Sequence, residues 1–133
     1  MDLTHYRFSI PMAVRDYEVD YQGIVNNANY LHYMEHTRHE FCKAVGLTFQ
    51  EMHDRGIDPV VAKVQIEYRS PLRMGDKFVS CLNIVRDGAK FIFIHDIFKE
   101  DGTLVVKGKI FIACIENGRL TRGDILAETF KIN

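Results

Sequence analysis

A change of hydrophobic period divides this chain into a helical part and a strand part. Between residues 28 and 45 a stripe of residues recurs every three or four positions, namely Tyr30, Met34, Thr37, Phe41 and Ala44. This spacing predicts one long helix. Before and after it, apolar residues recur at every second position, which predicts strands with one buried face. Because a single helix must bury its stripe against something, we expect an α+β fold in which it packs on a sheet.

One predicted strand precedes the helix. Its inward face is expected to carry Tyr6, Phe8, Ile10, Met12 and Val14. The proline at position 11 has no N–H to donate, so we expect this strand at an edge of the sheet or at a bulge.

Four predicted strands follow the helix, at residues 60–68, 77–85, 90–99 and 104–115. Asp-Gly pairs at 87–88 and 101–102 separate the last three, which predicts an antiparallel meander. The first of the four alternates apolar and polar residues and is expected to be half-buried. The last two are apolar on both faces, which predicts that a partner subunit covers the face that the helix leaves open.

Residues with known capping preferences mark the ends of the helices. The asparagines at 26, 27 and 29 are good N-cap residues for the long helix, and Gly46 fits the position after its end. Thr48 and Glu51 form a capping-box pattern, which predicts a second, short helix that ends at Gly56.

Length and composition exclude several classes of protein. The 133 residues suit one domain, over 1–133, and the net charge of −1 gives no reason to expect nucleic-acid binding. We find no apolar run of the roughly 18 residues that a membrane span needs, and no secretion signal. Three widely spaced cysteines indicate neither a disulfide framework nor a structural zinc site. We therefore expect a soluble, cytoplasmic protein.

The residues with the clearest chemical potential lie between the first strand and the long helix. Asp20 leaves the strand, and Gly23 gives the following turn backbone freedom. The unpaired N–H groups of residues 26–29 are expected at the positive end of the helix dipole. A carboxylate beside such donors can attack an activated carbonyl directly, or it can activate a water molecule that attacks the carbonyl. An aspartate before a helix is also typical of a turn or a cap, so Asp20 alone does not decide between these roles.

The surrounding motif resembles a known family. Residues 18–25 (Glu-Val-Asp-Tyr-Gln-Gly-Ile-Val), then Asn-Tyr-Leu at 29–31 and Glu35-x-x-Arg38, resemble the 4-hydroxybenzoyl-CoA thioesterase family of the hot-dog fold, as do residues 60–76. The resemblance implies a long central helix wrapped by a five-stranded antiparallel sheet. It also implies an acyl-CoA thioesterase without a cofactor, since coenzyme A is part of the substrate. A homodimer or homotetramer with its site between subunits is implied as well.

Residue roles follow from the same resemblance. Asp20 is the implied nucleophile or general base, and the main-chain N–H of Asn27 is the implied oxyanion donor. Asn27 departs from the family, in which His or Tyr often stands here, so only the backbone role is carried over. The remaining substrate-binding candidates are Gly23, Val25 and Tyr30 near the thioester, with Arg69, Arg73 and Lys90 as cations for the coenzyme A phosphates.

Several alternatives stay open. The substrate carrier could be acyl carrier protein, or the chain could bind acyl-CoA without hydrolysing it. His32 and His36 flank Glu35 in a pattern similar to that of a zinc protease, although the pairing of Glu35 with Arg38 is the simpler prediction. The acyl group is also open, since an aromatic lining allows an aroyl or a fatty acyl chain. The expected lining residues are Tyr21, Tyr30, Phe41, Phe91 and Phe93.

Overall fold

The computed structural model describes residues 1–132. The elements in chain order are β1 (Phe8–Ala13), a 3-10 helix η1 (Asp16–Glu18), α1 (Asn27–Val45), α2 (Phe49–Asp54), β2 (Ile57–Tyr68), β3 (Lys77–Asp87), β4 (Lys90–Lys99), β5 (Leu104–Glu116), β6 (Arg119–Thr121) and α3 (Asp124–Phe130).

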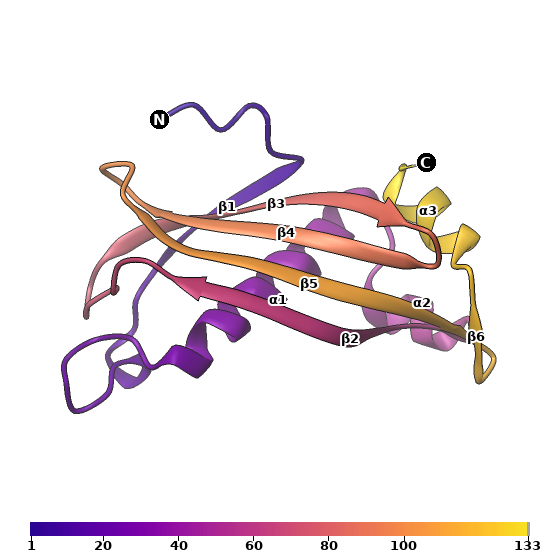
Figure 1. Ribbon diagram of the computed structural model, residues 1–133, viewed down its shortest axis with the longest axis horizontal. Coiled ribbons are helices and arrows are strands. Elements are labelled where there is room, and N and C mark those ends of the chain that lie inside the picture. Colours follow the sequence, from indigo (N-terminus) through magenta and orange to yellow (C-terminus); the bar gives the residue numbers. More distant parts are fainter. Residues whose placement is uncertain (133) are drawn as a thin grey trace.

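The strands form one curved antiparallel sheet, and α1 lies across one of its faces (Figure 1). The strand order is β1-β3-β4-β5-β2, so β1 and β2 are the edges. The predicted α+β hot-dog architecture of one long helix and five strands is confirmed, as is the edge position of the strand that contains Pro11. A short sixth strand, β6, pairs with the end of β5, and α3 follows it. Neither was predicted, because segments this short show no usable period.

The predicted ends of the helices are confirmed. The Asn26 side chain accepts a hydrogen bond from the Ala28 N–H and caps α1, and Gly46 ends it in a left-handed conformation with φ of 92°. Thr48 and Glu51 form the expected capping box of α2. The meander of β3, β4 and β5 is also confirmed, with Asp87 opposite Lys90 across the first turn.

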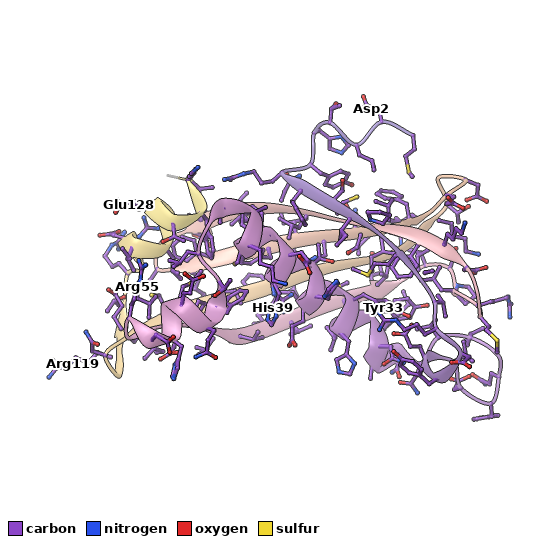
Figure 2. All side chains as sticks on the ribbon, turned by 180° about the vertical axis from the view of Figure 1, so that it is seen from behind. Asp2, Tyr33, His39, Arg55, Arg119 and Glu128 are labelled. Carbon is purple, nitrogen blue, oxygen red and sulfur yellow. The ribbon has the colours of Figure 1, made fainter. Side chains whose placement is uncertain are left out.

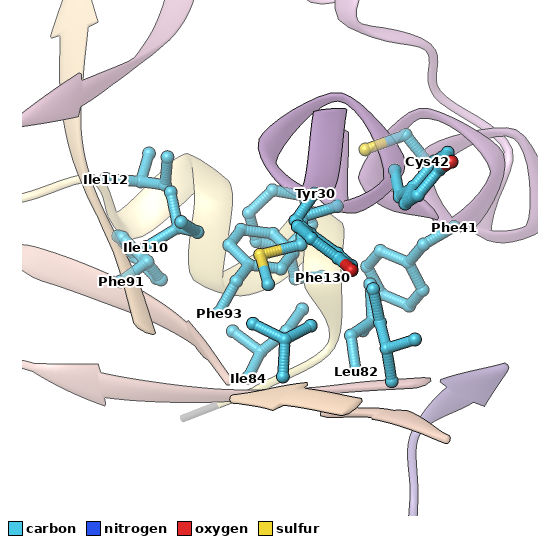
Figure 3. Packing of buried hydrophobic residues seen from close by; sticks show 14 of the residues in the cluster. Tyr30, Phe41, Cys42, Leu82, Ile84, Phe91, Phe93, Ile110, Ile112 and Phe130 are labelled. Carbon is cyan, nitrogen blue, oxygen red and sulfur yellow. The ribbon is translucent and has the colours of Figure 1, made fainter. Parts of the chain in front are cut away.

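The core lies between α1 and the inner face of the sheet (Figure 3). Met34 of α1 and Leu82 of β3 are fully buried there. Opposite Met34, β5 carries Gly108, where an added Cβ would lie 2.7 Å from the Met34 methyl carbon. The glycine thus lets the helix approach the sheet closely.

The buried stripe of α1 differs from the prediction at its C-terminal end. Ala44 is exposed, whereas Arg38 and Cys42 are buried. Residues four apart form a continuous row on a helix surface, and the sheet follows the row from Tyr30 through Met34 to these two residues. The prediction weighted apolar character, and so it included Ala44 in the buried stripe and left Arg38 out of it.

The position predicted for Tyr6 is wrong. The strand begins only at Phe8, after a turn in which the Tyr6 N–H donates to the Leu3 carbonyl over 3.0 Å. The Tyr6 hydroxyl donates to Asp96 Oδ2 over 2.5 Å, on the sheet face that α1 leaves open. The alternation therefore does not extend back to Tyr6.

β2 is more exposed than its alternating sequence predicts. Within residues 1–132 it pairs only with β5, and Val60, Val61 and Val64 are 40–52% exposed. A register shift between Val61 and Lys63 interrupts the alternation. No helix among the described residues is both long and apolar enough to cross a membrane.

Candidate active site

Asp20 lies in a tight hairpin between η1 and α1, which we call the Asp20 hairpin (residues 19–25). Val19 and Val25 pair across it, and the Asp20 N–H donates to the Ile24 carbonyl over 2.9 Å. The Gly23 N–H closes the turn by donating to the Asp20 carbonyl over 2.9 Å. Gly23 has φ of +79°, a conformation that L side chains rarely adopt, so glycine is required here by the turn.

The Asp20 carboxylate is half-buried and only partly engaged. Its Oδ1 accepts a hydrogen bond from the Gln22 N–H over 2.8 Å. The hydrogen bonds among residues 1–132 leave Oδ2 unused. Asp20 therefore does act as a turn residue, and one of its oxygens stays available for chemistry.

The start of α1 offers fewer donors than expected. The Asn26 N–H donates to the Glu18 carbonyl, the Ala28 N–H to Asn26 Oδ1, and the Asn29 N–H to the Asn26 carbonyl. Of the N–H groups at 26–29, within the described part of the chain, only that of Asn27 has no acceptor. The expectation of several unpaired donors is wrong, because Asn26 and the Glu18 carbonyl accept from the others, and the Asn27 N–H is the remaining candidate.

A cavity of about 410 Å³ brings these groups together with the end of β2. Of the predicted site residues, Asp20, Val25, Asn27, Tyr30 and Arg69 line it. The other lining residues, absent from the predicted site, are Gln22, Ile24, Tyr68, Ser70 and Pro71. The sequence did contain a signal for the last three, namely an aromatic residue followed by a Ser-Pro turn at the end of a strand.

Two tyrosines form one wall of this cavity. The ring centroids of Tyr30 and Tyr68 lie 5.6 Å apart. The Tyr68 hydroxyl donates to the Asn27 carbonyl over 3.1 Å, and the Tyr30 hydroxyl accepts from the Leu72 N–H over 3.1 Å. Burial raises the pKa of Tyr30. Both hydroxyls are thus held by backbone groups, and the two hydrogen bonds fix Tyr68 at the end of β2 and the Leu72 backbone to the first turn of α1.

The remaining aromatic residues of the predicted lining lie elsewhere. Phe41, Phe91 and Phe93 are buried in the core, around Phe130 of α3, and Tyr21 is 96% exposed at the hairpin tip. Of the five aromatic residues predicted as lining, Tyr30 alone lines the cavity in the described chain. Sequence spacing shows that these residues are apolar but does not show which end of the core they fill.

The predicted cations are spread over the chain. Arg69 lines the cavity, and its Nε lies 3.1 Å from Glu67 Oε1. Arg73 pairs through its backbone with Ile24 of the hairpin and lies outside the lining of the cavity. Lys90 begins β4, whose far end lies near Tyr68, so a strand of ten residues, about 30 Å, separates it from the cavity. Gly23 also lies outside the lining, so its role is to form the turn.

The predicted ion pair of Glu35 with Arg38 is not formed. Arg38 is buried, and its Nη1 donates to Nε2 of buried His95 over 3.2 Å, while Glu35 is exposed. Burial and the Arg38 charge hold the pKa of His95 well below its usual value. His95 is therefore neutral, with its proton on Nδ1.

The histidines of the zinc alternative lie on the exposed face of α1. His36 Nε2 lies 3.8 Å from Glu40 Oε1, one turn further along the same helix. Among residues 1–132, no group of three or more His, Cys, Asp or Glu side chains is arranged to hold a metal ion.

Comparison with known proteins identifies the family. The model of the thioesterase-like superfamily matches residues 14–128. A chloroplastic acyl-acyl carrier protein thioesterase of Arabidopsis thaliana is 41% identical over 91 residues, which are 68% of this chain and 48% of that protein. A putative acyl-CoA thioesterase of Bacillus subtilis is 32% identical over 106 residues, 79% of this chain and 77% of that protein.

A solved structure supports the predicted fold. The crystal structure of a hypothetical protein from Aquifex aeolicus is 32% identical to this chain, with a TM-score of 0.86, and covers 92% of this chain and 98% of its own. The chain thus belongs to the thioesterase-like superfamily, and the prediction of a hot-dog thioester hydrolase is confirmed at the level of the family.

Proposed function

We propose that this chain hydrolyses acyl-CoA thioesters, with Asp20 as nucleophile or general base and the Asn27 N–H as oxyanion donor. One observation carries the proposal: Asp20 and Asn27 line the same cavity. Asp20 keeps one oxygen without a hydrogen bond among the described residues, and the Asn27 N–H has no acceptor there. A carboxylate and a free N–H beside one cavity are what acyl transfer from a thioester needs.

Two routes lead from this arrangement to the same products. Asp20 can attack the carbonyl carbon and expel the coenzyme A thiolate, which leaves a mixed anhydride for water to hydrolyse. Alternatively, Asp20 takes a proton from a water molecule that attacks the carbonyl. In both routes negative charge develops on the carbonyl oxygen, where the Asn27 N–H would donate. The products are a free acid and the coenzyme A thiol, and coenzyme A enters only as part of the substrate.

Coenzyme A recognition is proposed to start at Arg69, a cationic residue that lines the cavity. Arg73 is a further candidate, since it pairs with Ile24 beside the hairpin. Lys90 lies too far along β4 to reach the same ligand within one chain. It would take part only if a partner subunit brought its own β4 start to this cavity.

A homodimer or homotetramer is part of the proposal. The open edge of β2 and its exposed valines at 60, 61 and 64 favour pairing with a second copy about a two-fold axis. Light scattering on the purified protein would give the mass, and a monomer at working concentration would contradict this part. We also propose a cytoplasmic location, which would keep the three free, buried cysteines reduced.

The carrier has a second candidate. The Arabidopsis relative is named as an acyl-acyl carrier protein thioesterase, which favours acyl carrier protein as an alternative to coenzyme A. Rates with the same acyl group on both carriers would separate the two. A third outcome, binding of acyl-CoA without release of thiol over hours, would point to a non-hydrolytic module.

The deciding experiment measures thiol release from short, long and aromatic acyl-CoAs. The Asp20→Asn variant keeps the size of the side chain and an oxygen that can accept from the Gln22 N–H. We expect kcat to fall by about 10²–10⁴-fold, the usual contribution of such a group, with an unchanged melting temperature. Leu120→Ala, at an exposed site on β6, is the control and should keep wild-type rates. Wild-type hydrolysis by Asp20→Asn would overturn the assignment.

A further inference from the structure

A buried carboxylate lies two residues before Asp20 and takes no part in the proposed reaction. Glu18 is 7% exposed, at the end of η1. Its Oε1 accepts two hydrogen bonds, from the Arg15 N–H over 2.8 Å and from the Tyr33 hydroxyl over 2.9 Å. The Arg15 guanidinium lies 3.7 Å from Oε2 and adds a charge partner. A buried carboxylate is costly unless it is paired in this way, so this position has a specific use.

The backbone carbonyl of Glu18, like its side chain, accepts two hydrogen bonds. Its carbonyl accepts from the Asn26 N–H over 3.1 Å and from Asn29 Nδ2 over 2.9 Å. The Asp20 hairpin leaves from Glu18 and returns at Asn26, so one residue holds both ends of the hairpin. Through Asn29, the same carbonyl is tied to the first turn of α1.

Tyr33 connects this anchor to the core. Its ring is buried and lies 4.8 Å from the Phe78 ring of β3, centroid to centroid, and 6.0 Å from the Tyr30 ring. Figure 2 shows Tyr33 on α1, beside the loops at the end of the molecule where the helix begins. Burial and the Glu18 carboxylate both raise the pKa of Tyr33, so its hydroxyl keeps its proton and donates.

We infer that the hydrogen bond between Tyr33 and Glu18 positions the Asp20 carboxylate against the Asn27 N–H. The inference rests on the proposed function, because it assigns a positioning role for that reaction. Asp20 follows Glu18 by two residues, and Asn27 follows the Asn26 that Glu18 holds. The relative placement of the two reacting groups is therefore set through Glu18, whose carboxylate is fixed to α1 by Tyr33.

The first test deletes the hydrogen bond without changing the packing. In Tyr33→Phe we expect kcat for acyl-CoA hydrolysis to fall by about 10- to 100-fold, the usual effect of a small misplacement of a reacting group, with KM within about two-fold of wild type. Tyr6→Phe is the matched control, since it also removes a hydroxyl that donates to a carboxylate, at Asp96, away from the cavity. The control should keep wild-type kcat.

A second variant separates positioning from folding. Glu18→Gln keeps an acceptor oxygen for the Arg15 and Tyr33 donors and should retain most of the activity, whereas Glu18→Ala should lose it as Tyr33→Phe does. Glu51→Ala removes another glutamate that accepts from the N–H three residues before it, at the start of α2, and should leave kcat unchanged. A fall in melting temperature with unchanged kcat in Tyr33→Phe would overturn the inference and leave a purely structural role.

The double variant links the effect to Asp20. If Tyr33 acts by placing Asp20, adding Tyr33→Phe to Asp20→Asn should cause no further loss of kcat. A further 10-fold loss in the double variant would contradict this route. The two failures are distinguishable: wild-type activity of Asp20→Asn overturns the proposed function itself, whereas wild-type kcat of Tyr33→Phe with an inactive Asp20→Asn overturns only the positioning role.

Discussion

The two ends of helix α1 have different surroundings: a cavity at its start and a packed aromatic cluster towards its end. At its start, the hairpin and the end of β2 surround a cavity, and the backbone keeps an N–H without an acceptor among residues 1–132. Towards its end, Phe130 of α3 pairs with Phe41, Phe91 and Phe93, and Phe41 also pairs with Phe93 (Figure 3). The ring centroids of these pairs lie 5.5–6.4 Å apart. We call these the open end and the closed end.

The closed end is sealed by a segment that has no part in the site. Phe130 is the last residue of α3, and its carbonyl accepts from Arg7 Nη2 over 2.5 Å. Arg86 holds the start of α3 through Asp124 Oδ1, 2.6 Å away, and through the Arg122 carbonyl, 2.7 Å away. The comparison teaches that aromatic content alone does not mark a binding site in this fold. The same residue types close the core at one end and line a cavity at the other.

The largest expected effect on stability comes from a substitution at the closed end. Phe130→Ala should lower the free energy of unfolding by about 3–5 kcal/mol, the usual cost of a deleted buried aromatic ring, because three buried rings (Phe41, Phe91 and Phe93) lose a shared partner. Denaturant unfolding measures the loss, and kcat per folded molecule should stay within about two-fold of wild type. A change of acyl-chain preference in this variant would break the comparison, because the closed end would then reach the substrate.

His95, which lies between the two ends, is expected to have a smaller effect on the free energy of unfolding, and only at acid pH. Its folded-state pKa lies well below the ordinary value of 6.5, so below pH 6.5 the unfolded chain binds a proton that the folded chain does not. Stability is then full above pH 6.5 and falls as the pH drops, by up to about 1.4 kcal/mol per pH unit. The free energy of unfolding at pH 8 and pH 5, from denaturant titrations, checks this.

Two variants locate that pH dependence. His95→Gln cannot gain the proton, so the difference between pH 8 and pH 5 should shrink, whatever the variant does to stability at pH 8. His36→Gln, on the exposed face of α1, should leave the difference as in wild type. An equal acid loss in wild type and His95→Gln would show that another group is responsible.

The smallest expected effect compares a cation at each end. Arg69→Ala should raise KM for acyl-CoA about five-fold with little change in kcat, because Arg69 is an exposed cation worth at most about 1 kcal/mol. The effect should shrink at high salt, since exposed charges are screened. Lys90→Ala should leave KM unchanged in a monomeric site. If Lys90→Ala instead raises KM, and the rise disappears when the oligomer dissociates, the closed end of one copy must lie against the open end of another.

Much of this fold could be read from local patterns. The long helix was predicted from 28 to 45 and spans Asn27–Val45, since its caps at Asn26 and Gly46 are short-range signals. The meander was predicted from its turn residues for the same reason. In contrast, β6 and α3 were missed, because their position depends on pairing with β5 and on the packing of Phe130.

The candidate site divides in the same way. Asp20, Gly23 and the helix start are neighbours in sequence, so a local motif was enough to propose them together. Tyr68, Ser70 and Pro71 reach the cavity from more than forty residues away, and nothing in the local pattern says which loop they meet. The pairing of Arg38 with His95 likewise spans 57 residues and replaced the predicted neighbour Glu35.

The sequence by itself determined the period of each element, the caps, the turns and the motif that contains Asp20, because these depend on contacts within a few residues. Only the tertiary structure decided which aromatic residues seal the core and which line the cavity. It alone showed that Asn27 keeps a free N–H among the described residues and that Glu18 holds both ends of the Asp20 hairpin. Burial and hydrogen-bond satisfaction belong to the packed chain, since each depends on what distant segments bring to the same place.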